Sequence, residues 1–181
     1  RKEKSSFLEE RLTKSGLSLE QGKKYGLKEN KQGILIPYYD PEGNPKKDAK
    51  GRDYSRTRLK FPEDNAKYKS QVNAGIRVFI PCEVHSYLTN NNNTPVIITE
   101  GELKTIKATE EGFPTIGIGG NWLWKEKKGS NELNPDLIPY AIPGREFIVI
   151  WDSDATENPN FDHATRMFSR ALAEYQCTLK R

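Results

Sequence analysis

The feature that most constrains the fold is an apolar run, Phe147 to Trp151, in which neither face of a strand would carry a polar side chain. Such runs are typical of parallel sheets, whose strands are covered by helices on both faces. Asp152-Ser153-Asp154 follows the run directly. The sequence therefore predicts a covered parallel strand that ends in carboxylates.

Strand and helix patterns alternate around this run, which is the order of elements in α/β folds with right-handed crossovers. Short apolar runs mark the strands, and apolar spacings of three and four mark the helices. The expected elements are strand 96–99, helix 102–111, strand 115–118, a helical turn in the loop 121–144, strand 147–151, helix 161–176 and a strand from residue 177 that the chain end leaves incomplete. We therefore expect an α/β domain with a parallel sheet and flanking helices.

The first half of the chain has a different pattern. Ser6 with Glu9, and Ser18 with Gln21, have the spacing of capping boxes, which predicts two short helices. Strands are expected over 33–39, 54–61 and 76–80, with turn residues after the first. This half is predicted to be a small α+β unit built on an antiparallel sheet.

The polar run Asn90 to Asn93 is the expected domain boundary, with one domain over 1–89 and the other over 90–181. The charges are divided similarly. Residues 1–70 hold 18 basic and 11 acidic residues, whereas the remainder holds 11 and 14. This asymmetry predicts polyanion contact in the first half and cation handling in the second, with an unevenly charged solvated surface as the alternative.

The chain has no feature of a membrane or secreted protein. Its longest apolar runs have about five residues, against the ~20 of a membrane helix, and no signal sequence is visible. Cys82 and Cys177 are too sparse for a disulfide framework, so we expect free thiols and a cytoplasmic location. Cys82-x-x-His85 has no second close pair of ligands, so zinc is not expected.

Acidic residues follow two strands of the second half. Glu100-Gly101-Glu102 follows strand 96–99, and Asp152 and Asp154 follow strand 147–151. Parallel strands end at the same edge and neighbours lie about 4.8 Å apart, so these carboxylates can meet around one or two cations. Hard oxygen ligands predict Mg²⁺, or Mn²⁺ in its place.

Glycines at the same edge predict an approach for phosphate. Gly101 precedes a helix N-terminus, whose dipole favours anions, and Gly119 and Gly120 follow strand 115–118. Each feature also has an ordinary structural explanation, because acids cap helices and Asp-x-Asp is common in turns. Their joint placement at one edge favours a functional site.

The succession of these motifs resembles the TOPRIM domain of bacterial-type primases, topoisomerases and some nucleases. The matching segments are Val96-Ile97-Ile98-Thr99-Glu100-Gly101, Thr115-Ile116-Gly117-Ile118-Gly119-Gly120 and Ile148-Val149-Ile150-Trp151-Asp152-Ser153-Asp154. The resemblance implies that Glu100 is a general acid or base, or a metal ligand, and that Asp152 and Asp154 bind Mg²⁺. The variant Glu100-Gly101-Glu102-Leu103-Lys104 is more specifically similar to uncharacterised TOPRIM-containing domains of plasmid and phage replication proteins, which often precede a helicase.

Lys104 departs from the pattern, because many primase-type relatives have an aspartate there. A lysine either binds a triphosphate or product phosphate, or pairs with Glu100 and silences the metal site. The main hypothesis is an enzyme of plasmid or phage DNA replication, with Glu100 and Lys104 as catalytic residues. It would perform Mg²⁺-dependent, primase-type nucleotidyl transfer, with single-stranded DNA, nucleoside triphosphates and a helicase module as partners. The alternatives are a TOPRIM-type nuclease and a non-catalytic nucleic-acid-binding or docking module.

A basic strand in the first half is a candidate nucleic-acid interface. A period of two places four residues on one face of strand 54–61, namely Tyr54, Arg56, Arg58 and Lys60. This face is predicted to hold a phosphate backbone and stack a base, with an ordinary solvated face as the alternative. Trp122 and Trp124 either stack on a nucleotide or pack in the core.

Overall fold

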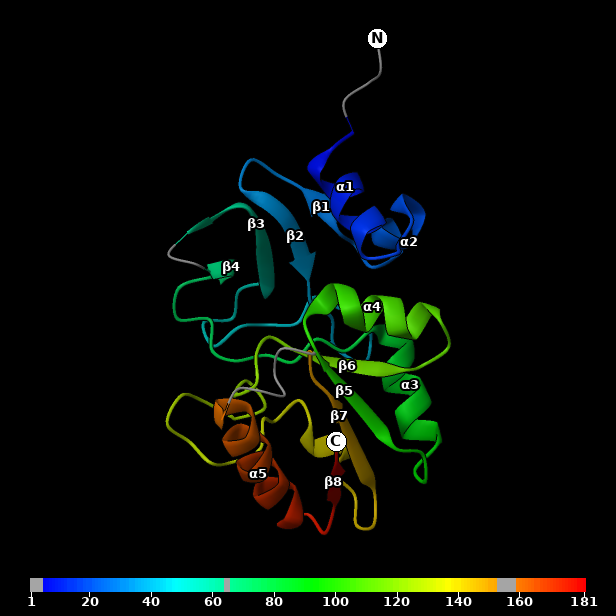
Figure 1. Ribbon diagram of the computed structural model, residues 1–181, viewed down its shortest axis with the longest axis vertical. Coiled ribbons are helices and arrows are strands. Elements are labelled where there is room, and N and C mark those ends of the chain that lie inside the picture. The colour runs from blue at the N-terminus through cyan, green and yellow to red at the C-terminus, as the bar shows by residue number, and fades with distance from the viewer. Residues whose placement is uncertain (1–4, 64–65, 153–158) are drawn as a thin grey trace. The chain divides into compact units, whose positions relative to one another are not determined.

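The computed structural model describes residues 5–63, 66–152 and 159–181 (Figure 1). The chain divides into two compact units, an N-terminal unit over residues 1–74 and a C-terminal unit over residues 75–181. In the described part of the chain, no helix is long and apolar enough to cross a membrane.

The N-terminal unit is an antiparallel sheet with two helices, which confirms the expected α+β unit. Its elements are α1 (Phe7–Lys14), α2 (Leu19–Lys24), β1 (Lys28–Glu29), β2 (Gly33–Pro37), β3 (Ser55–Glu63) and β4 (Ala66–Ser70), with sheet order β1-β2-β3-β4. Both capping boxes form, because Ser6 Oγ accepts the Glu9 N–H at 3.2 Å and Ser18 Oγ accepts the Gln21 N–H at 3.1 Å. These contacts fix the first turns of α1 and α2.

The C-terminal unit contains a parallel sheet of order β6-β5-β7-β8 with flanking helices, which confirms the expected fold class. Its elements are α3 (Cys82–Asn90), β5 (Val96–Glu100), α4 (Glu102–Glu110), β6 (Thr115–Ile118), the 3₁₀ helix η1 (Ile138–Tyr140), β7 (Glu146–Ile150), α5 (Pro159–Ala173) and β8 (Thr178–Lys180). In Figure 1, α5 runs beside β8, on which it packs. The helical turn expected in the long loop is η1.

The two faces of β7 are covered unequally. Phe147 and Val149 are buried, and the Phe147 ring meets Phe168 of α5 edge-on with centroids 6.4 Å apart. On the other face, Ile148 is half-buried and Ile150 is 55% exposed. The prediction of cover on both faces is therefore wrong at Ile150, because α4 packs mainly on β5 and β6.

The strand predicted over 76–80 does not belong to the antiparallel sheet. Phe79 instead forms an isolated antiparallel bridge with Gly117 of β6, through two backbone hydrogen bonds of 2.8 Å. Val78 and Ile80 are buried in the core of the C-terminal unit. The alternating apolar pattern marks a buried extended segment, but its partner lies in the other sheet, so that prediction is wrong.

The asparagine run lies inside the C-terminal unit, so the compact units divide before it. The buried guanidinium of Arg145 donates hydrogen bonds to backbone carbonyls of Leu88, Asn91 and Asn92 at 2.9, 2.6 and 3.0 Å. These bonds give the buried guanidinium its hydrogen-bond acceptors, and they give the carbonyl groups at the end of α3 a donor. The asparagine run, whose polar composition predicts a linker, instead forms the C-terminal end of α3 and the loop after it, and Arg145 holds this segment in place.

The sequence gives no start signal for α3, because the residue before it, Pro81, has no side chain that can cap a helix. On this helix Cys82 is an exposed free thiol, and buried His85 contacts the Tyr140 hydroxyl through Nδ1. Burial raises the pKa of Tyr140 to about 12, with a further contribution from Asp136. Among the described residues no group of three or more potential ligands gathers around a metal position, and His85 is explained by packing.

Candidate active site at the carboxyl edge of the parallel sheet

The ends of β5 and β7 lie side by side. Thr99 pairs with Ile150 in the parallel register, and Thr99 Oγ1 donates a hydrogen bond to the Ile150 carbonyl at 3.1 Å. Glu100 is the last residue of β5, and Asp152 follows the end of β7. The two carboxylate residues therefore leave the sheet at the same edge, from neighbouring strands.

Gly101 connects this edge to α4. Its φ of 91° lies in a region that favours glycine, and a Cβ built on it would meet no atom of the described residues within 4 Å. Its N–H already donates to the Ile118 carbonyl at 2.9 Å, and its carbonyl accepts from Thr105 Oγ1 at 2.8 Å. Gly101 therefore leaves space for a small group beside the start of α4, but its own N–H is already engaged.

Two further features shape the edge beside β6. A Cβ on Gly117 would lie 2.3 Å from Thr105 Oγ1, so the absence of a side chain lets α4 pack closely on β6. Gly119 and Gly120 follow β6 directly and are half-buried. They lie at the same edge as Gly101, where the sequence predicts phosphate.

Lys104 of α4 forms an ion pair with Asp152. The two side chains are 52% and 42% exposed, so both remain accessible to water. The lysine reaches from a helix to the residues that follow a different strand, and it compensates a carboxylate that is predicted to hold metal. Asp152 is a partner for Lys104 that the sequence analysis does not predict.

Glu102, the other acid of the first motif, does not stand at the open edge. It is 1% exposed in the first turn of α4, where the helix dipole favours a carboxylate. Asp154 lies outside the described residues, so its predicted metal contact stays a prediction.

The donor chemistry of the edge suits Mg²⁺. Glu100 and Asp152 supply the hard oxygen atoms that this ion prefers. The ammonium of Lys104 against Asp152 shows that the position already attracts a cation. The residues therefore fit a divalent metal, which would have to compete with Lys104 for Asp152.

The predicted basic strand is β3, and its four residues have different surroundings. Tyr54 is 4% exposed and meets Tyr38 edge-on at 4.8 Å, so it belongs to the core and cannot stack a base. The guanidiniums of Arg56 and Arg58 lie 4.9 and 5.1 Å from the centre of the Tyr68 ring.

Arg58 also donates a hydrogen bond to the Tyr68 hydroxyl at 2.9 Å. Lys60 is exposed, with its ammonium 5.9 Å from the centre of the Phe7 ring. Arg56 is buried, so Arg58 and Lys60 are the members of the predicted set that remain accessible to a nucleic acid.

Trp122 and Trp124, the two tryptophans of the long loop, have different surroundings. Trp124 is fully buried and stacks on Phe168 with centroids 5.1 Å apart. Trp122 is half-buried, and the Lys125 ammonium lies 4.3 Å from its ring centre. Trp124 therefore packs in the core, as one of the two alternatives predicts.

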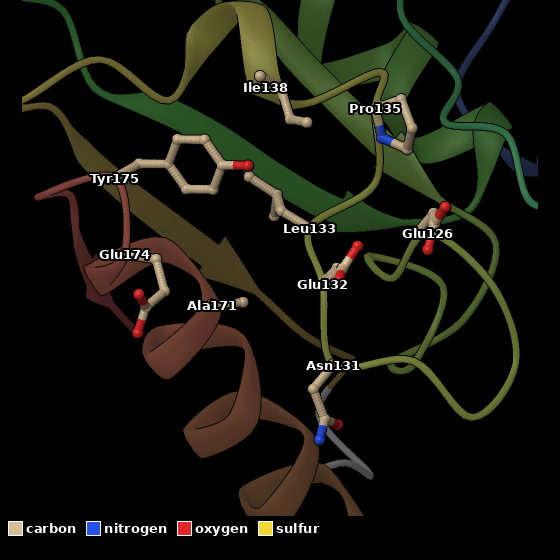
Figure 2. A pocket seen from close by; sticks show the side chains of 9 residues that line it. All are labelled: Glu126, Asn131, Glu132, Leu133, Pro135, Ile138, Ala171, Glu174 and Tyr175. Carbon is tan, nitrogen blue, oxygen red and sulfur yellow. The ribbon is translucent and has the colours of Figure 1, made fainter.

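A cavity of about 530 Å³ lies elsewhere in the C-terminal unit (Figure 2). Its lining combines apolar side chains with three glutamates, and consists of Glu126, Asn131, Glu132, Leu133, Pro135, Ile138, Ala171, Glu174 and Tyr175. Figure 2 shows the loop residues on one side of the cavity, and Ala171 of α5 with Glu174 and Tyr175, which follow this helix, on the other. No residue of the predicted site lines this cavity.

Comparison with known proteins places the chain in a family. Residues 85–181, more than half of the chain, match the family described as a domain of unknown function, DUF3854. The chain belongs to this family. No curated protein matches this DUF3854 chain.

The fold of the DUF3854 chain is similar to that of bacterial primases. It matches the crystal structure of the Aquifex aeolicus primase zinc-binding and RNA polymerase domains with a TM-score of 0.66 and 13% identity, over 97% of this chain and 49% of that chain. The chain thus spans about half the length of that structure. Weaker matches are the E. coli primase catalytic core (TM-score 0.49, 13% identity, 93% of this chain and 72% of that chain) and a DnaG primase catalytic domain bound to ssDNA (0.47, 13%, 93% and 74%).

Proposed function

We propose that this DUF3854 chain contains a TOPRIM-type, Mg²⁺-dependent nucleotidyl-transfer domain of a plasmid or phage replication primase. The observation that carries the proposal is the position of Glu100 and Asp152 at the ends of neighbouring parallel strands. Support also comes from the fold, which resembles that of the Aquifex primase. In open parallel sheets, the carboxyl edge is where ligands bind.

The proposed reaction joins two nucleotides on a single-stranded DNA template. Glu100 and Asp152, with Asp154, would hold Mg²⁺, which when bound neutralises charge on the triphosphate. Glu100 accepts the proton of the attacking 3′-hydroxyl, whose oxygen bonds to the α-phosphorus as pyrophosphate leaves. Lys104 binds phosphate oxygens. Arg58 and Lys60 bind the template backbone, and a helicase module is the expected partner.

The test is dinucleotide synthesis on single-stranded DNA with nucleoside triphosphates and Mg²⁺. We expect the double variant Asp152→Asn/Asp154→Asn to lose synthesis, and Glu100→Gln to lose at least about 100-fold in rate because a proton acceptor is removed. Glu111→Gln is the matched control, because its carboxylate pairs with Lys107 at the far end of α4. Undiminished synthesis by the double variant would disprove the assignment.

Phosphodiester cleavage is the alternative reaction of the same site. Labelled single- and double-stranded DNA and RNA are incubated with Mg²⁺ or Mn²⁺ in the absence of nucleotides. Cleavage that disappears in the double variant would favour a nuclease, whereas intact substrates with active dinucleotide synthesis favour the primase.

The Lys104–Asp152 ion pair favours a second candidate, a non-catalytic nucleic-acid-binding module in which lysine replaces the metal. This candidate predicts that DNA binding is the same in EDTA and in Mg²⁺, and that Mg²⁺ leaves the melting temperature unchanged. A metal-dependent rise in melting temperature that requires Asp152 would exclude it.

A further inference from the structure

The Lys104–Asp152 ion pair joins two elements that meet only in the folded chain. Lys104 comes from α4, and Asp152 follows β7. The next lysine of the same helix, Lys107, pairs instead with Glu111, which is four residues later and caps the C-terminus of α4. Lys107 therefore provides an internal comparison: it has the same charge and lies on the same helix, but it has no link to the edge of the sheet.

The exposure of the Lys104–Asp152 pair allows other ions to replace either partner. Both partners are about half exposed, and ion pairs with this exposure are weak because water and salt compete for each charge. A divalent cation at Asp152 must still displace the ammonium, since both need the same carboxylate. The ion pair therefore sets a threshold for metal binding without abolishing it.

A ligand that attracts Lys104 would remove this threshold. Phosphoryl oxygens carry more negative charge than one carboxylate and bind lysine as a point charge. Lys104 lies within one turn of Gly101, where a Cβ would meet no atom of the described residues within 4 Å. A phosphate at that end of the helix would lie within reach of the lysine and near a favourable dipole.

We propose that the Lys104–Asp152 ion pair is a latch that weakens metal binding at Asp152 until a phosphate-bearing ligand engages Lys104. The proposal rests on the metal site of the proposed function. In the closed state Lys104 holds Asp152, and in the open state Lys104 binds phosphate while Asp152 is released to the metal. Metal and phosphate then bind cooperatively, each raising the affinity of the other by the same factor.

The latch is tested by titrating Mn²⁺ and measuring the free ion by its paramagnetic resonance, with and without inorganic phosphate. Four proteins are compared: wild type, Lys104→Met, Lys107→Met and Asp152→Asn. Without phosphate, Lys104→Met should bind Mn²⁺ about two- to fivefold more tightly than wild type, which is the range for losing an exposed ion pair. Lys107→Met should match wild type, and Asp152→Asn should lose the site.

The addition of phosphate provides a second measurement, in which the latch of the wild-type protein is opened by a ligand. After correction for Mn²⁺ bound by phosphate itself, it should raise the affinity of wild type towards that of Lys104→Met and leave Lys104→Met unchanged. Equal affinities in wild type and Lys104→Met, with binding lost only in Asp152→Asn, would overturn the latch and leave the metal site standing. Absence of Mn²⁺ binding in wild type and Lys104→Met, with and without phosphate, would overturn both.

Discussion

The two units place their charged side chains in opposite ways. In the N-terminal unit, the antiparallel strand β3 carries arginine and lysine along its length, at Arg56, Arg58 and Lys60. In the C-terminal unit, β5 and β6 carry no charged side chain before Glu100, and the acids Glu100 and Asp152 stand where strands end. The difference follows from connectivity, because helical crossovers cover a parallel sheet whereas hairpins leave antiparallel faces open to water.

Because the charges are placed differently, we expect the two units to bind different kinds of ligand. On β3, Arg58 and Lys60 remain accessible along one strand face, and cations spaced along a strand suit a polymer with repeating phosphates. A strand end brings a few side chains to one point, which suits a small ion or a reacting group. The charge distribution is consistent with a polyanion in the first half and a cation in the second. Residues 1–70 carry 18 basic and 11 acidic residues, whereas the remainder carries 11 basic and 14 acidic residues.

The largest expected effect is a loss of stability when a cavity is made in the core of one unit at a time. All three tryptophans, Trp122, Trp124 and Trp151, lie in the C-terminal unit, so their fluorescence reports that unit alone. Phe168→Ala removes the ring stacked on Trp124 and should destabilise the C-terminal unit by about 3–5 kcal/mol. The measurement is urea unfolding followed by fluorescence.

The matched variant is Ile36→Ala, which creates a cavity at a fully buried position of β2. It should cost about 2–5 kcal/mol in the N-terminal unit and shift the far-ultraviolet circular dichroism transition. The tryptophan transition should stay near that of wild type. An equal shift of the fluorescence midpoint by Ile36→Ala would mean that the two units unfold as one.

An intermediate effect is expected on the binding of single-stranded DNA. Arg58→Ala removes an accessible cation from β3, so the affinity should fall severalfold at low salt and the salt dependence should weaken by about 0.7 in log–log slope. Lys69→Ala is the control, because Lys69 pairs with Thr57 and therefore stands on the opposite face of the sheet. Fluorescence anisotropy with a labelled oligonucleotide measures both, and equal losses would show that binding does not depend on the face.

Local signals in the sequence predicted the elements whose stabilising contacts are close along the chain. The capping boxes at Ser6 and Ser18 form as expected, because each joins residues three apart. The sequence did not predict β4, since Lys67-Tyr68-Lys69 places charge on both sides of a half-buried tyrosine and gives no apolar period. Edge strands of this kind are defined by backbone pairing with their neighbour rather than by burial.

Contacts between distant residues account for the rest of what the sequence could not show. The carboxyl edge followed from the parallel direction of the strands, which the alternation of apolar runs with helical patterns predicts. The partner of Lys104 did not, because Asp152 is 48 residues away and only the packing of α4 beside β5 and β6 brings the two together. The same holds for Phe79, whose bridge to Gly117 joins an extended segment to β6, a strand far along the chain in the same unit.

The smallest expected effect is an acid sensitivity of the N-terminal unit. Asp48 is buried in the turn before β3, where its carboxylate accepts the N–H groups of Lys50 and Arg52 at 2.7 and 2.9 Å and the Arg52 Nε–H at 2.7 Å. Burial raises the pKa of Asp48, but these hydrogen bonds and the Arg52 charge outweigh it, so the pKa is lower than that of an exposed aspartate.

A lowered pKa in the folded chain means that the unfolded chain binds the proton more readily. The contribution of Asp48 to stability is therefore present above the ordinary aspartate value of about 4 and is lost as the pH falls through the lower folded value. Urea unfolding of the N-terminal unit, followed by circular dichroism between pH 7 and pH 2, should show a steeper loss in wild type than in Asp48→Asn. Asp53→Asn, which alters an exposed ion pair with Lys47, is the control and should follow the wild-type profile. If Asp48→Asn and wild type lose stability in parallel, the acid sensitivity does not arise at this turn, and Glu29, whose pKa is lowered mainly by the Leu8 N–H, is the next carboxylate to replace.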